Sequence, residues 1–156
     1  MKNNIINIIN SLKKNNQTIS FAESCTGGLL ASSFVSISGV SDVFNGSLVT
    51  YSNQIKNSWL KVDEKILEDY GAVSKECVSS MLDGIRLMAK SDYAVAISGI
   101  AGPNGGTAQK PVGTVYIGIL SPYSREIFAC LFDGDRKDIQ LQSVKFTIEK
   151  LSKTIK

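Results

Sequence analysis

The segment Tyr93–Ser98, with the sequence YAVAIS, is short and almost entirely apolar. A run of this length without polar alternation is typical of a strand that is buried on both of its faces. Such a strand needs helices on either side of its sheet, because a face left open to water would carry polar side chains at alternate positions. This segment therefore predicts an α/β protein built on a central sheet.

The rest of the chain alternates between helical and strand-like patterns. Apolar residues at helical spacing predict helices over 3–14, 29–38, 53–59, 62–70, 75–88 and 136–155. Strands are expected over 18–21, 47–52, 93–98, 111–119 and 126–132, with a turn at 43–46 and an antiparallel hairpin closed by 121–124. Leu141 and Trp59 are expected in the core. The pattern predicts a three-layer α/β/α sandwich with a mixed, mostly parallel sheet, and a single domain over 1–156.

The composition excludes several kinds of catalysis. Histidine is absent, which excludes Ser-His-Asp and Cys-His catalysis and every zinc site with a histidine ligand. Cys25, Cys77 and Cys130 are widely spaced and form no CxxC pair, so neither a disulfide framework nor a thiolate metal site is expected. We expect no metal and no cofactor. An enzyme of this composition must use a lysine, a carboxylate or a tyrosine as its base.

The same bulk properties bear on location and partners. The three cysteines and the lack of a signal-peptide pattern predict a cytoplasmic protein. The longest apolar run is only long enough for a strand, so we expect no membrane association. The net charge of +3 is mild, and most lysines lie on the terminal helical segments, where a solvated face is the ordinary explanation. We therefore expect no nucleic-acid partner.

Four loops are richer in Gly, Ser, Thr and Asn than simple connections require. They are Glu23–Gly28, Gly46–Lys56, Ser98–Thr107 and Asp133–Arg136. The first and third follow strand-like runs directly, and the second contains the end of one. Because the carboxyl ends of parallel strands meet at one edge of a sheet, these loops predict a single ligand site there.

Lys56 is the candidate for the base that histidine would otherwise provide. It lies in the first turn of the helix expected at 53–59, where the helix dipole disfavours a cation. A lysine of lowered pKa beside the Ser24 hydroxyl would generate a nucleophile, although spacing alone also fits an ordinary surface lysine. Cys25 is the alternative nucleophile, since a helix N-terminus lowers the pKa of a thiol, but it has no histidine to activate it.

Three other features predict anion binding. The loop Ser98–Thr107 matches no standard phosphate-binding pattern, yet its backbone N–H groups could hold an anion, and a plain surface loop is the alternative. Arg136 could clamp a phosphate or pair with a nearby carboxylate. The helix that begins after Glu23–Gly28 offers unpaired N–H donors, and simple capping of this helix by Thr26 is the alternative.

A series of motifs follows in order over nearly the whole chain: AESCTGG at 22–28, VTYSN at 49–53, GAVS at 71–74, ISGIAGP at 97–103, GG at 105–106, KPVGTV at 110–115 and GDR at 134–136. Together they closely resemble the CinA C-terminal domain family. In this family the domain occurs alone, as nicotinamide-nucleotide amidohydrolase, or behind a molybdopterin-binding-like domain in the competence/damage-inducible protein CinA. This chain looks like the stand-alone form.

The resemblance implies a reaction and a partner. The reaction is hydrolysis of nicotinamide mononucleotide to nicotinic acid mononucleotide and ammonia, a recycling step of pyridine nucleotide metabolism that uses no metal. The resemblance also implies a homo-oligomer, a dimer or larger. Two other functions stay open: a catalytically idle nucleotide-binding module, and an amidohydrolase that acts on another small amide.

The residues and the resemblance together suggest catalytic roles. Ser24 is the expected nucleophile, with Ser47 as the competing candidate. Lys56 is the expected base. Tyr51 either orients Lys56 or protonates the departing ammonia, and Glu23 is either a base or the partner that holds a lysine in place.

The remaining roles concern the substrate. Backbone N–H groups around Cys25–Gly28, with the Thr26 hydroxyl, are expected to bind the oxyanion or the phosphate. The loop Ser98–Gly106 and Arg136 are expected to hold ribose and phosphate. The residues expected to contact substrate are Glu23, Cys25, Thr26, Gly27, Gly28, Ser98, Gly99, Gly102, Gly105, Gly106, Thr107 and Arg136.

Overall fold

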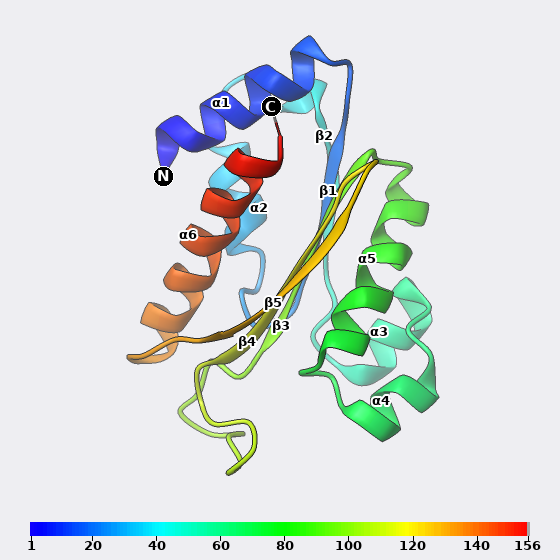
Figure 1. The fold of residues 1–156 in the computed structure, drawn as a ribbon, viewed down its shortest axis with the longest axis vertical. Coiled ribbons are helices and arrows are strands. Elements are labelled where there is room, and N and C mark those ends of the chain that lie inside the picture. Colours follow the sequence, from blue (N-terminus) through cyan, green and yellow to red (C-terminus); the bar gives the residue numbers. More distant parts are fainter. Residues whose placement is uncertain (156) are drawn as a thin grey trace.

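A five-stranded sheet forms the centre of the computed structural model, which describes residues 1–155 (Figure 1). In spatial order β2-β1-β3-β4-β5, its strands are β2 (Phe44–Val49), β1 (Ile19–Glu23), β3 (Tyr93–Gly99), β4 (Thr114–Leu120) and β5 (Arg125–Leu131). β1 is parallel to both β2 and β3, whereas β4 is antiparallel to β3 and to β5. All strands except β4 therefore run in one direction, and the predicted mixed sheet is confirmed.

Helices cover both faces of the sheet, which confirms the three-layer sandwich. Figure 1 shows α1 (Lys2–Lys14), α2 (Leu29–Val35) and α6 (Arg136–Thr154) on one face, and α3 (Asn53–Leu60), α4 (Glu64–Tyr70) and α5 (Lys75–Ala89) on the other. A short 3₁₀ turn, Val40–Asp42, lies between α2 and β2. Each face has its own cluster of buried apolar side chains. β1 is buried at every position and β3 at all but its last, as expected for strands covered on both faces.

Side-chain caps explain where the helices that flank the site begin. Ser52 accepts a hydrogen bond from the N–H of Ile55 at the start of α3, and Ser74 accepts one from Cys77 at the start of α5. α6 begins with a capping box, in which Asp135 and Asp138 each accept a bond from the other's backbone N–H. Within residues 1–155, every helix is too short or too polar to span a lipid bilayer.

Three details differ from the sequence-based predictions. The prediction of a turn at 43–46 is wrong, because Phe44, Asn45 and Gly46 belong to β2. The pairing skips Asn45, since Ile19 faces Phe44 and Ser20 faces Gly46, so Asn45-Gly46 forms a bulge. Trp59 and Leu141 are not core residues either, since their exposed fractions are 46% and 53%.

Candidate active site

The carboxyl ends of β1, β2 and β3 bring the predicted polar loops together. Ser24 follows β1, Thr50 and Tyr51 follow β2, and Ile100 follows β3. The fourth loop joins them at the start of α6, where the Arg136 guanidinium donates from Nη1 to the carbonyl of Gly102 at 2.7 Å. The convergence expected from parallel strand ends is therefore observed.

Ser24 and Lys56 form a buried pair at this edge. Lys56 Nζ donates to Ser24 Oγ at 3.1 Å, to the carbonyl of Thr50 at 2.7 Å and to that of Tyr51 at 3.2 Å. Lys56 is only 1% exposed and Ser24 7% exposed, so the pair is largely shielded from water. The three contacts satisfy all three N–H donors of the ammonium form. Lys56 is therefore not a surface lysine: its buried side-chain nitrogen lies within hydrogen-bond distance of Ser24 Oγ.

Burial lowers the pKa of Lys56 below its ordinary value of 10.5, because a low-polarity environment disfavours the ammonium form. The nearby Cys77 and Cys25 act in the opposite direction, with smaller effects. A lowered pKa increases the fraction of neutral amine at any given pH, and the neutral amine is the form that accepts a proton. Two carbonyls would then hold the remaining N–H groups while the lone pair faces Ser24.

Glu23 is not placed to contact substrate. Its carboxylate is fully buried and accepts hydrogen bonds from the Thr26 hydroxyl and from the N–H groups of Gly28, Leu30 and Ala31. It therefore occupies the anion site at the N-terminus of α2 that we expected an oxyanion or a phosphate to use. The prediction that the Thr26 hydroxyl and the Gly28 N–H bind substrate is corrected for the same reason.

Cys25 is a poor candidate for a thiolate nucleophile. Burial raises the pKa of its thiol to about 11, whereas a helix N-terminus alone would lower it. The thiol is therefore protonated near neutral pH. The N–H of Thr26 donates to no other residue of the described chain, and the N–H of Cys25 contacts only its own thiol. They are the backbone donors nearest to Ser24 in the sequence that no carbonyl or carboxylate group of the described chain accepts from.

A pocket of about 230 Å³ opens beside the Ser24–Lys56 pair. Its lining contains eight of the residues named as site candidates together with five that were not named individually, three of which belong to the predicted loop Ser98–Gly106. The predicted residues are Ser24, Cys25, Tyr51, Ser98, Gly99, Gly102, Gly105 and Arg136. The added ones are Ala72, Val73, Ile100, Ala101 and Asn104. Ala72 and Val73 belong to the GAVS motif and Ile100 and Ala101 to ISGIAGP, so the motifs held the signal for four of the five.

Arg136 and Tyr51 contact each other at the pocket rim. Arg136 Nη2 donates to the Tyr51 hydroxyl at 2.6 Å, so this hydroxyl does not contact Lys56; only the Tyr51 backbone carbonyl does. Arg136 thereby connects the loop after β2 with the loop after β3. A guanidinium has five N–H donors, and two are used here, which leaves the others for a bound anion.

The other predicted site residues lie outside the pocket lining or have hydrogen-bond partners within the protein. Ser47 Oγ contacts Glu23 Oε1 at 3.5 Å rather than Lys56. Thr107 forms a local turn with Lys110, and Gly106 packs against Val112, where a Cβ atom would lie 2.7 Å from the Val112 nitrogen. Gly27 takes a positive φ of 59° in the turn after Ser24. The Ser98 hydroxyl lines the pocket but donates to the carbonyl of Ala72 at 2.8 Å.

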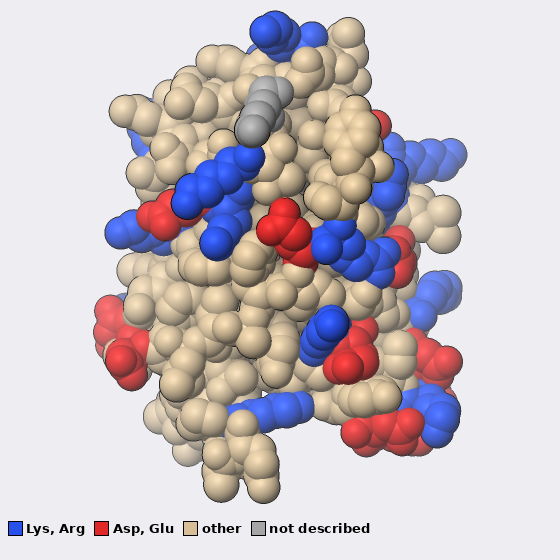
Figure 2. All heavy atoms as spheres, viewed as in Figure 1, with Lys and Arg blue, Asp and Glu red and all other residues tan. Residues whose placement is uncertain are grey.

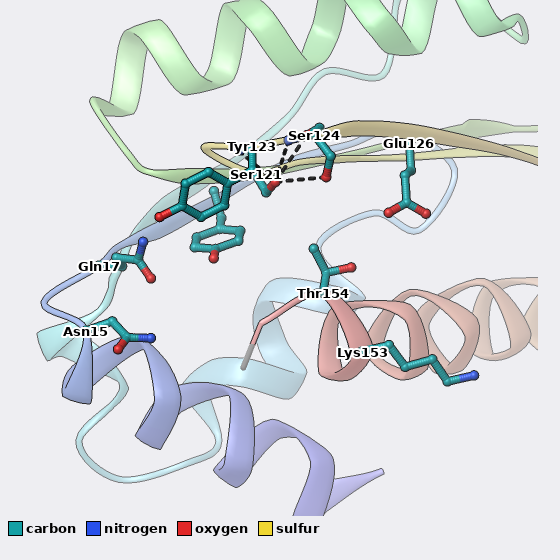
Figure 3. Close-up of a pocket in the computed structure, with 9 residues that line it drawn as sticks. Asn15, Gln17, Ser121, Tyr123, Ser124, Glu126, Lys153 and Thr154 are labelled. Atoms are coloured by element: carbon teal, nitrogen blue, oxygen red, sulfur yellow. Dashed lines mark hydrogen bonds between the residues drawn. The ribbon is translucent and has the colours of Figure 1, made fainter.

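Other surface features carry no comparable chemistry. A hollow of about 700 Å³ lies at the opposite end of the sheet, where Tyr123 and Ser124 face Gln17 and Thr154 (Figure 3). Among the described residues that line it, no nucleophile is held against a base. On the face shown in Figure 2, basic and acidic side chains are interspersed. Within residues 1–155, no cluster of three or more Cys, Asp or Glu side chains is arranged to hold a metal ion.

These features define an α/β sandwich whose parallel strand ends present a serine to a buried lysine. The chain belongs to the CinA C-terminal domain family, whose sequence model matches residues 3–155. The family resemblance of the sequence motifs is thereby confirmed.

Similar proteins support this assignment. A CinA-like protein of Thermotoga neapolitana is 46% identical over 149 residues, which cover 96% of this chain and 36% of the relative. A CinA-like protein of Prochlorococcus marinus strain MIT 9215 is 56% identical over 142 residues, 90% of this chain and 34% of the relative. The chain thus spans about a third of the length of these curated relatives.

Solved structures agree in fold. The CinA superfamily protein KP700603 from Klebsiella pneumoniae superposes with a TM-score of 0.94 at 32% identity, covering 99% of this chain and 96% of that protein. The competence/damage inducible protein CihA of Agrobacterium tumefaciens superposes with a TM-score of 0.93 at 35% identity, covering 96% of this chain and 92% of that protein.

Proposed function

We propose that this chain hydrolyses the carboxamide of nicotinamide mononucleotide to give nicotinic acid mononucleotide and ammonia. The observation that carries the proposal is the buried lysine amine held 3.1 Å from Ser24 Oγ by two backbone carbonyls. Serine needs a base to attack an amide, and a lysine of lowered pKa can serve as one in a chain without histidine.

The first half of the proposed reaction forms an ester with the enzyme. Neutral Lys56 takes the hydroxyl proton as Ser24 Oγ bonds to the amide carbon, and the carbonyl electrons move onto the oxygen. The N–H groups of Cys25 and Thr26 stabilise that oxyanion in the proposal. The C–N bond then breaks, and the proton held by Lys56 passes to the leaving nitrogen, which departs as ammonia.

The second half restores the enzyme. Lys56 takes a proton from water, the resulting hydroxide adds to the ester carbon, and the C–O bond to Ser24 breaks. The same proton returns to Ser24 Oγ. The product is released as the carboxylic acid, which loses its proton to solvent to give the carboxylate. Arg136, with its remaining N–H donors, holds the 5′-phosphate in the proposal, because a guanidinium pairs with phosphate through directed hydrogen bonds. The loop Gly99–Gly105 contacts the ribose.

The test is ammonia release from nicotinamide mononucleotide by the purified chain in the presence of a chelator. Turnover that disappears in Ser24→Ala and persists in Ser47→Ala supports a metal-free hydrolase with Ser24 as the nucleophile. Binding of the nucleotide without ammonia release contradicts the proposal in favour of an idle binding module. Ammonia release from another small amide alone contradicts the choice of substrate.

A further inference from the structure

Gln140 lies on α6 and contacts the loop that carries Ser24. Its side-chain Nε2 donates to the backbone carbonyl of Cys25 at 2.7 Å. Gln140 is partly buried and does not line the pocket, so it does not meet a substrate there. The sequence motifs gave no sign of this residue. Its contact is made to the peptide directly after the proposed nucleophile.

The Cys25 carbonyl is an effective place from which to orient this turn. The peptide group between Cys25 and Thr26 is planar, so fixing its carbonyl also fixes the direction of the Thr26 N–H. The other backbone hydrogen bonds of the turn run from Ser24 N–H to Ile97 of β3 and within the turn itself, from Gly27 to Ser24 and from Leu29 to Thr26. The hydrogen bond from Gln140 connects this turn to α6.

Gln140 and Arg136 are four residues apart and therefore lie on the same face of α6. Arg136 holds the loops after β2 and β3 through Tyr51 and Gly102, and Gln140 holds the loop after β1 through Cys25. The first turns of one helix thus hold all three loops that follow the parallel strands.

We propose that Gln140 is a positioning residue of the hydrolase site, which fixes the Ser24–Gly27 turn relative to the loops held by Arg136. This inference rests on the proposed function. Displacement of a reacting group by about 1 Å can cost about a hundredfold in rate, so loss of this contact is expected to lower kcat rather than to weaken binding.

Gln140→Glu provides a test that a merely structural role would not pass. An ionised carboxylate would repel the Cys25 carbonyl oxygen, whereas a protonated carboxyl group could donate to it as the amide does. We expect kcat for ammonia release to fall at least about tenfold at pH 8, with KM within about threefold of the wild-type value. The ratio of variant to wild-type kcat should rise as pH falls toward about 5, because a glutamate has an ordinary pKa of about 4.3.

The neighbouring charges do not prevent this titration. The charged groups that act on Cys25 are Lys56, Glu23 and Arg136. Arg136 and Lys56 favour the carboxylate form and Glu23 disfavours it. The elements α1, α2 and β4 pack against α6. Of these, α2 contributes no titratable side chain, whereas α1 carries Lys2, Lys13 and Lys14 and β4 carries Tyr116. Taking the ratio to wild type at each pH removes the effect of Lys56 titration that both proteins share.

Gln142→Glu is the matched control. Gln142 is also on α6 and also donates from Nε2 to backbone carbonyls, those of Asp133 and Asp138, but not to the Ser24 loop. We expect it to show no recovery of relative kcat at low pH. Gln140→Leu should lower kcat by the same factor at every pH, because leucine cannot donate a hydrogen bond to the Cys25 carbonyl at any pH.

Several outcomes would overturn the inference. They are wild-type kcat in Gln140→Leu, a Gln140→Glu ratio that does not change with pH, and an equal recovery in Gln142→Glu. If wild type releases no ammonia, the proposed function fails, and the rate at which a fluorophosphonate labels Ser24 replaces kcat in the same pH comparison. Absence of labelling in wild type would overturn both proposals.

Discussion

Lys56 combines complete burial with three hydrogen bonds, one of which reaches Ser24 Oγ. Lys56→Arg tests whether the residue acts as a base or only as a positive charge, because arginine keeps its charge at all accessible pH values. We expect kcat for ammonia release to fall by about a thousandfold, the usual contribution of a general base being about 10² to 10⁴.

The pH profile gives a second check on Lys56. The proposed mechanism requires the neutral amine of Lys56. Wild-type kcat should therefore rise with pH and level off above the pKa of Lys56, which burial lowers below 10.5. Lys61→Arg is the control, since Lys61 ends the same helix with its amine on the carbonyl of Ser58. A Lys56→Arg variant with wild-type kcat would contradict the base assignment.

Glu23 shows how a residue of the most conspicuous motif can serve the fold instead of the substrate. Glu23→Gln keeps the shape of the side chain but replaces one carboxylate oxygen by an NH₂ group. This group cannot accept the hydrogen bonds that the carboxylate oxygen accepts in the wild type, so some of the buried N–H or O–H groups lose their partner. We expect the free energy of unfolding to fall by about 2 to 4 kcal/mol, the cost of leaving buried polar groups unpaired. Urea titration measures this change.

Glu149→Gln is the control for Glu23, because Glu149 is exposed on α6 and its side chain makes no hydrogen bond to the described chain. Its stability should change by less than about 0.5 kcal/mol. If Glu23→Gln keeps wild-type stability and instead raises KM for the nucleotide, the carboxylate contacts substrate and its structural assignment is wrong.

At the scale of elements, α3 and α5 meet at Gly84. A Cβ atom on Gly84 would lie 2.1 Å from the carbonyl oxygen of Leu60, the last residue of α3. Gly84→Ala must therefore separate the two helices. We expect stability to fall by about 2 kcal/mol in urea titration, although alanine gains about 1 kcal/mol in helix propensity. Turnover should also fall, because α3 carries Lys56.

Leu87→Ala is the control for Gly84, since Leu87 lies three residues further along α5 and is 79% exposed. It should change stability by less than about 0.5 kcal/mol. A stabilised Gly84→Ala would show that the helices adjust without cost.

Patterns within an element were readable from the sequence, whereas irregularities needed the neighbouring strand. The apolar run of β3 predicted its burial. Asn45-Gly46 has the composition of a turn, yet it forms a bulge because β2 continues along β1 on either side of it. Leu141 fits helical periodicity but lies outside the face of α6 that packs on the sheet.

At the scale of the whole molecule, Arg136 connects two loops that come from distant parts of the chain. Arg136→Lys keeps the charge, but one ammonium group cannot reproduce the fixed fork that donates to both Gly102 and Tyr51. We expect KM for nicotinamide mononucleotide to rise about tenfold, the loss of one charged hydrogen bond of about 1.5 kcal/mol. Stability should change by less than about 1 kcal/mol, because the side chain is exposed.

Steady-state kinetics measures the Arg136 effect, with Arg86→Lys as the control. Arg86 lies on α5, away from the pocket lining. Unchanged KM in Arg136→Lys would show that neither the loop contacts nor the charge contributes to binding.

The sequence by itself determined the α/β sandwich, the family and the four loops that converge, and it named Ser24 and Lys56 as the expected nucleophile and base. These follow from local periodicity, strand ends, short motifs and the absence of histidine, all of which can be read along the chain. Only the tertiary structure decided which hydrogen-bonding groups of the site already have partners within the protein. Glu23 fills the helix terminus that looked open, Tyr51 pairs with Arg136, and Gln140 reaches Cys25 from 115 residues away. Hydrogen-bond partners depend on three-dimensional packing, so no local pattern reveals them.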